Sequence, residues 1–130
     1  MAMVEEIKKS NMKFNDLDWH DSIIQNIVID RSNPGRNDTI KIVVIWPNNI
    51  KNILCFEDVY WANFDMNFGL VGSESVLRAY SEGREYEIVK NFYLRWKGFI
   101  DNIDLSFYEI ETSSTKSKIK IIANRFTLRD

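Results

Sequence analysis

Apolar and polar residues alternate through most of the chain, which is the pattern of half-buried β-strands. We predict strands over residues 22–30, 39–46, 50–57, 58–68, 104–112 and 118–128. The segments 50–57 and 58–68 form either two strands or a single strand that bends at Glu57 and Asp58. Turn-forming residues separate the first strands, and the polar loop 113–117 joins the last two in a hairpin.

The segment 58–68 shows the clearest alternation. One of its faces is apolar and comprises Tyr60, Ala62, Phe64, Met66 and Phe68. The other face comprises Trp61, Asn63, Asp65 and Asn67. Because successive side chains of a strand point to opposite sides, we predict that the first face is core and that the second meets solvent or a partner.

Two helices are predicted between the fourth and the fifth strand. Ser73 is a typical N-cap for a short helix. From about residue 84 to residue 98 the apolar period changes to about 3.6, which predicts a long amphipathic helix. A strand through Tyr86, Ile88 and Leu94 is the alternative for this segment.

The predicted element order is therefore β-β-β-β-α-α-β-β. Short connections favour antiparallel neighbours, and a long amphipathic helix must bury its apolar stripe against one face of the sheet. We predict the α+β class, with a mainly antiparallel sheet of about six strands and one long helix packed on it. The 130 residues form a single globular domain, residues 1–130.

Composition excludes several kinds of chemistry. The chain has one His and one Cys, so a Cys/His zinc site, a Cys-x-x-Cys redox pair and an internal disulfide are excluded. Cys55 lies in an apolar strand and is expected to be an inert core residue. No run of about 18 apolar residues occurs, and the first residues do not form a signal peptide. We therefore expect a cytoplasmic protein with no cofactor and no membrane contact.

Charge is distributed unevenly along the chain. Residues 54–87 carry seven acidic and two basic side chains, whereas residues 116–130 carry five basic and one acidic. Two solvated surfaces of opposite sign are the simplest interpretation. The sequence pI of about 5.5 argues against a dedicated nucleic-acid binder.

One segment concentrates chemically active side chains. Asp16, Asp18, His20 and Asp21 lie within six residues of one another. They indicate either an oxygen-rich metal site or an acid–base pair around the imidazole, which titrates near neutral pH. The alternative is a polar turn at the entry to a strand, with these side chains bonding local backbone groups.

Several segments resemble a known group of proteins. The residues Trp19-His20-Asp21-Ser22-Ile23-Ile24 lead into a strand that ends in Asp30-Arg31, and Phe56 to Trp61, Asn67 to Gly69 and Ser117 to Ala123 continue the likeness. Over about residues 14–128 the sequence resembles small bacterial α+β domains, some of which look like immunity proteins of polymorphic toxin systems. The resemblance implies a cytoplasmic, non-enzymatic protein that binds and neutralises one cognate partner.

The sequence thus supports three hypotheses. The first is a non-enzymatic, partner-binding protein of the toxin-neutralising kind. Its candidate surface comprises Trp61, Asn63, Asp65, Asn67, Glu82, Glu85 and Glu87. An acidic surface suits a basic partner and speeds its association. The second is a metal-assisted hydrolase that uses Asp18, His20 and Asp21, and the third is a structural homodimer joined through exposed sheet.

Overall fold

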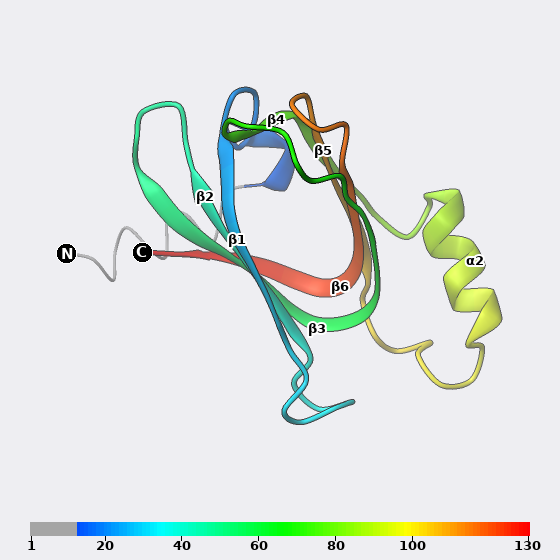
Figure 1. The fold of residues 1–130 in the computed structure, drawn as a ribbon. Helices are drawn as coiled ribbons and strands as arrows, with labels where there is room; N and C mark the ends of the chain where they lie inside the picture. Colours follow the sequence, from blue (N-terminus) through cyan, green and yellow to red (C-terminus); the bar gives the residue numbers. More distant parts are fainter. Residues whose placement is uncertain (1–12) are drawn as a thin grey trace.

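A computed structural model of the chain describes residues 13–130, which form six strands, one short α-helix and one turn of 3-10 helix (Figure 1). The elements in chain order are η1 (Phe14–Asp16), β1 (Ile23–Asp30), β2 (Thr39–Ile45), β3 (Lys51–Asp65), β4 (Glu74–Glu82), α2 (Glu87–Arg95), β5 (Ser106–Thr112) and β6 (Lys118–Arg129). Neighbouring strands are antiparallel, which confirms the predicted antiparallel sheet.

The sheet closes on itself as a barrel in the order β1-β2-β3-β6-β5-β4. The closing contact between β1 and β4 is short and comprises two pairs, Ile23 with Ser75 and Ile24 with Glu74. Beyond it, the segment that precedes β1 takes over as the neighbour of β4, because the Asp21 N–H donates to the Val76 carbonyl at 3.0 Å. The segment directly before β1 therefore completes the part of the barrel wall that β1 leaves open.

The barrel interior is filled by side chains from all six strands and from the segment before β1. Phe14 and Trp19 enter it from that segment, and their rings lie 4.8 Å apart. The Trp19 indole N–H donates to the Phe14 carbonyl at 2.8 Å, which satisfies its one polar group inside an apolar core. Phe56 and Tyr108 meet edge-to-face at 5.0 Å in the same core. The segment interpreted as a polar turn at the entry to a strand thus also supplies two side chains that fill the barrel interior.

A second, smaller core lies outside the barrel, beneath α2. Phe107 of β5 and Ile122 of β6 point outward and are buried against Val89 of the helix. Trp61 of β3 packs at the border of the same cluster. Figure 1 shows α2 beside the outer face of the sheet rather than across an open sheet. None of the helices in residues 13–130 is long and apolar enough to cross a membrane.

The α+β prediction with two helices is wrong. The segment after Ser73, predicted to be a helix, is the strand β4, because pairing with β5 along its length decides its conformation over local propensity. The predicted long helix over 84–98 is the nine-residue α2, Glu87–Arg95. Beyond the end of the helix, Ile100 is still buried in the second core, whereas Phe99 is 82% exposed.

The two segments 50–57 and 58–68 form one bent strand, β3, as the second alternative states. Asp58 has a φ of 52°, and the register with β6 shifts between Val59 and Trp61. Such an extra residue bends a strand and re-aims the side chains on either side of it. Ala62 and Phe64 accordingly pack against the barrel core, whereas Tyr60, also predicted to be core, is 40% exposed.

Core packing makes a direct prediction about stability. Phe56 is fully buried in the barrel, so Phe56→Ala is expected to lower the free energy of unfolding by about 3–5 kcal/mol. The same change at the exposed Phe99 is expected to alter it by no more than about 0.5 kcal/mol. Urea denaturation followed by circular dichroism measures both values, and equal losses would contradict the assignment of the core.

Candidate functional site

The candidate site lies where β3 separates from β2. The ladder between the two strands ends at the pair Thr39–Glu57, and one further bond follows, from the Val59 N–H to the Asp38 carbonyl at 3.0 Å. From there to Asp65, β3 pairs with β6 alone. Within residues 13–130 no main-chain partner lies on the other side of residues 60–65. One edge of the strand is therefore free.

The hydrogen-bond pattern between β5 and β6 shows which residues of β3 direct their main-chain groups toward the free edge. The Thr112 N–H donates to the Ser117 carbonyl at 2.9 Å, which fixes the phase of the β5–β6 ladder. Main-chain groups of an antiparallel strand alternate between its two neighbours. Lys118 and Lys120 consequently direct their main-chain groups away from β5 and toward β3.

The same alternation continues onto β3. Asn63 pairs with Lys120 and Asp65 pairs with Lys118, so Asn63 and Asp65 use their main-chain groups in the β6 ladder. Ala62 and Phe64 direct their N–H and C=O groups to the opposite side. These four main-chain groups form a template for a further strand, as on any exposed sheet edge.

A cleft of about 340 Å³ runs beside this edge, between it and the end of the β1–β2 hairpin. Its apolar wall includes Ile40, Ala62 and Phe64, and its polar lining includes Arg31 and Asp38. A second hollow of about 200 Å³ shares Arg31 and Asp38 with it and extends toward the hairpin turn. The free edge therefore opens into a groove rather than onto a flat surface.

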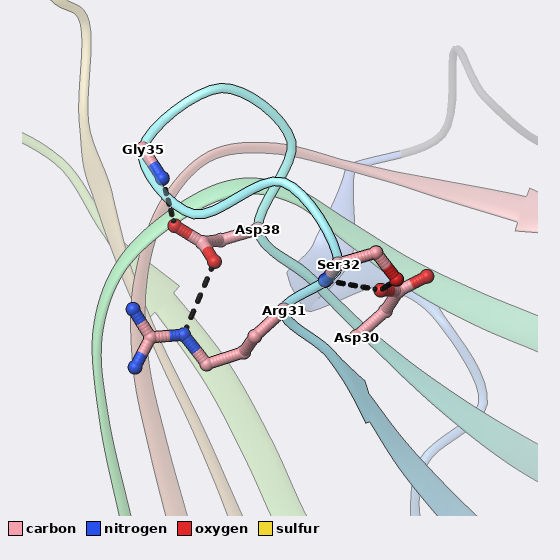
Figure 2. A network of polar contacts seen from close by, with 5 residues as sticks. All are labelled: Asp30, Arg31, Ser32, Gly35 and Asp38. Atoms are coloured by element: carbon pink, nitrogen blue, oxygen red, sulfur yellow. Dashed lines mark hydrogen bonds and ion pairs between the residues drawn. The ribbon is translucent and has the colours of Figure 1, made fainter.

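A hydrogen-bond network holds the hairpin turn in shape at the end of the groove (Figure 2). Asp38 accepts one bond from the Arg31 Nε–H at 3.2 Å and another from the Gly35 N–H at 2.9 Å. Gly35 has a φ of +79°, which favours glycine over other residues. Asp30 accepts bonds from the main-chain N–H and the hydroxyl of Ser32. These hydrogen bonds therefore hold the turn in place as one wall of the groove.

These bonds also fix the charge of the turn. The Gly35 N–H, and after it Arg31, lower the pKa of Asp38, although partial desolvation opposes them. The Ser32 hydroxyl and N–H lower the pKa of Asp30. Both carboxylates are thus ionised near neutral pH. Burial, and then the charge of Asp58, raise the pKa of the Tyr60 hydroxyl, which stays protonated and able to donate.

The lining of the groove carries slightly more acidic than basic side chains. Three carboxylates line the two hollows, those of Asp30, Asp38 and Asp58, and Asp65 lies next to the free edge opposite Lys118. Two guanidinium groups oppose them, those of Arg31 and Arg36, and the Arg31 group is bound to Asp38. The arrangement offers a main-chain template, an apolar wall and a negative rim, and these together suit an extended, basic segment of polypeptide.

The structure brings together only part of the predicted partner surface. Asn63 and Asp65 lie exposed on the outer side of β3, next to the free edge. Asn67 lies in the following loop, where its side-chain amide donates to the Thr115 carbonyl at 2.8 Å. Trp61 is half-buried beside the second core, and Glu82 lies across β6 and β5 from it at the end of β4.

The acidic residues of the helix entry form a separate surface. Glu85 and Glu87 are exposed at the start of α2, and Glu85 makes an ion pair with Lys90 at 3.4 Å. Tyr86, which lies between them in the sequence, packs against the same second core as Trp61.

The Asp/His segment does not form a convergent site. His20 and Asp21 are both exposed, with Nε2 and Oδ2 3.7 Å apart. The His20 Nδ1 atom lies 3.2 Å from the Leu77 carbonyl of β4, a main-chain group distant in sequence rather than the local one that the alternative interpretation describes. Asp18 borders a different hollow beside Trp46. Among the described residues, no group of three or more His, Cys, Asp or Glu side chains could hold a metal ion.

Sequence reasoning missed the two residues that matter most in the groove, Ala62 and Phe64. Their contribution is the direction of main-chain groups, which depends on where β2 ends relative to β3 and leaves no mark in side-chain chemistry. The predicted bend at Glu57 and Asp58 was the one available signal, since a bend is where a strand changes neighbours. Comparison with family models, with curated proteins and with solved structures finds no match.

Hydrogen exchange tests the free edge directly in the wild-type protein. The amides of Ala62 and Phe64 are expected to exchange faster than those of Asn63 and Asp65, on the order of tenfold or more, because only the latter pair bonds to β6. Two-dimensional NMR in deuterated buffer resolves the four signals individually. Equal protection of all four would show that the edge is occupied.

The turn network makes a prediction about pH. Because the folded-state pKa of Asp38 is lowered from 3.8, its contribution to stability is complete above pH 3.8 and is lost as the pH falls through the folded-state value. The Gly35 amide shift is expected to titrate with Asp38, with a midpoint below 3.8. Asp38→Asn serves as the control and should abolish the titration. A midpoint at or above 3.8 would contradict the bond.

Proposed function

We propose that this protein binds a partner protein by accepting an extended segment of it as an additional strand on the free edge of β3. One observation carries the proposal: among residues 13–130, residues 60–65 have a strand partner on one side only, and a groove lies along the other. Strand addition is a common mode of peptide recognition, in which main-chain bonds supply affinity and the surrounding side chains supply selectivity.

The geometry of the groove supports this mode. Ala62 and Phe64 offer main-chain donors and acceptors, and an added strand would satisfy them while burying the apolar wall beside Ile40. The hairpin turn is held by the Asp38 bonds before any partner arrives. A preformed wall reduces the entropy lost on binding and so favours affinity.

We propose further that the partner is a cognate, toxin-like protein and that the chain acts in the bacterial cytoplasm without catalysis or a cofactor. The resemblance to immunity proteins supports this biological role, and the acidic rim of the groove supports a basic partner. The hydrolase hypothesis receives less support, because Asp18 lies apart from the His20–Asp21 pair.

A selection experiment with a matched variant tests strand addition. A displayed library of random linear heptapeptides is selected on the immobilised full chain. Selected peptides are expected to bind the wild type and to lose at least about tenfold in affinity for Ala62→Pro, because proline removes a main-chain donor from the free edge. Isothermal titration calorimetry measures both affinities.

Two measurements distinguish a loss of binding from a loss of folding in Ala62→Pro. Circular dichroism and thermal unfolding establish that Ala62→Pro is folded at the temperature of the titration. Independently, a selected peptide is expected to slow hydrogen exchange at Ala62 and Phe64 in the wild type. Peptides that bind Ala62→Pro as tightly as the wild type, or that leave both amides unprotected, would refute strand addition.

A further inference from the structure

The occupied edge of β3 shows what kind of strand fits the free one. On the β6 side, Asn63 and Asp65 stand opposite Lys120 and Lys118. Both members of these pairs face outward, because cross-strand partners lie on the same side of a sheet. β6 therefore places a basic side chain beside each of these two polar residues of β3.

At the inward-facing positions, apolar residues of β3 stand opposite aliphatic residues of β6. Ala62 pairs with Ile121 and Phe64 pairs with Ile119, and all four side chains contribute to the barrel core. The strand that already accompanies this part of β3 thus reads Lys-Ile-Lys-Ile, with lysine outward and isoleucine inward.

A strand on the free edge would meet the same two faces of the same residues. Its inward side chains would lie beside Ala62 and Phe64 and the apolar wall of the groove. Its outward side chains would lie beside Asn63 and Asp65. We infer that the partner segment alternates aliphatic and basic residues, as β6 does; this inference rests on the proposed function and specifies its partner.

The charges around the edge agree with this assignment. Asp65 lies directly next to the free edge, and no ion pair within 4 Å is found for it in residues 13–130. The nearest cations on the β6 side, Lys118 and Lys120, stand one strand further away from an incoming segment. With Asp58 at the bend, the incoming basic side chains meet the acidic rim first.

A second copy of the chain is a less suitable occupant. Two β3 edges brought together would place Asp65 and Asp58 of one copy near those of the other, and like charges across a strand pair are destabilising. The segment of this chain with the required pattern, Lys118 to Ile121, is already part of the barrel.

A synthetic peptide with the sequence of residues 117–123, Ser-Lys-Ile-Lys-Ile-Ile-Ala, tests the inference. With capped ends, it is expected to bind the full chain and to slow hydrogen exchange at Ala62 and Phe64. The matched control replaces both lysines with glutamate and is expected to bind about tenfold or more weakly, since the favourable pair with Asp65 becomes a like-charge pair and both glutamates meet the acidic rim. A scrambled peptide of the original composition controls for non-specific attraction.

A charge exchange in the protein provides the decisive comparison. The double variant Asp65→Lys, Lys118→Asp keeps a pair of opposite charges across β3 and β6 but reverses the charge next to the free edge. It is expected to shift the ratio of the two affinities by about tenfold or more toward the glutamate peptide. An unchanged ratio would overturn the inference.

The remaining outcomes separate this inference from the proposed function. Equal binding of the lysine and glutamate peptides, with both lost in Ala62→Pro, would overturn the alternation of charge while leaving strand addition intact. Failure of every peptide to protect Ala62 and Phe64 would overturn the inference, and the library selection would then decide strand addition independently. A wild-type dimer in sedimentation velocity that Ala62→Pro converts to a monomer would assign the edge to a second copy instead.

Discussion

The structure depends on one strand having different neighbours along its length. β3 has 15 residues and β2 has seven, so β2 cannot satisfy the main-chain groups of β3 beyond the bend. β6 pairs with both halves of β3 and follows it through the bend at Asp58. A bulge of this kind bends the strand and the sheet that contains it, and the sheet closes as a barrel. The groove lies where β3 continues beyond the end of β2.

Closure through two residue pairs leaves much of the barrel wall to be completed by other means. The segment before β1 runs along β4 and inserts Phe14 and Trp19 into the interior, so a stretch that is polar in composition becomes structural. Outside the barrel, Phe107 and Ile122 remain apolar and are covered by α2. α2 therefore shields this apolar patch from solvent.

The two halves of β3 differ in what they offer to another molecule. The first half is enclosed between β2 and β6, and most of its side chains are buried, namely Asn52, Leu54, Cys55 and Phe56. The second half keeps one side of its backbone open, beside an apolar wall and carboxylates that are ionised near neutral pH. Asn63 and Asp65 are exposed beside this edge, where polar side chains oppose edge-to-edge association of sheets. In the proposed binding mode, the same residues would set the charge that an incoming segment encounters.

The sequence by itself determined every strand except β4, the turn at Gly35 and the polar alternation around Asn63, and it offered the bend at Asp58 as one of two alternatives, because these features depend on local periodicity and on turn-forming residues. It also predicted that the polar face of this part of β3 meets solvent or a partner. Tertiary structure alone decided that the segment after Ser73 is a strand, that α2 is short, and that Trp61 is covered while Ala62 and Phe64 offer free main-chain groups. These outcomes depend on which strands meet and where each pairing ends, and pairing between distant segments overrides local preference.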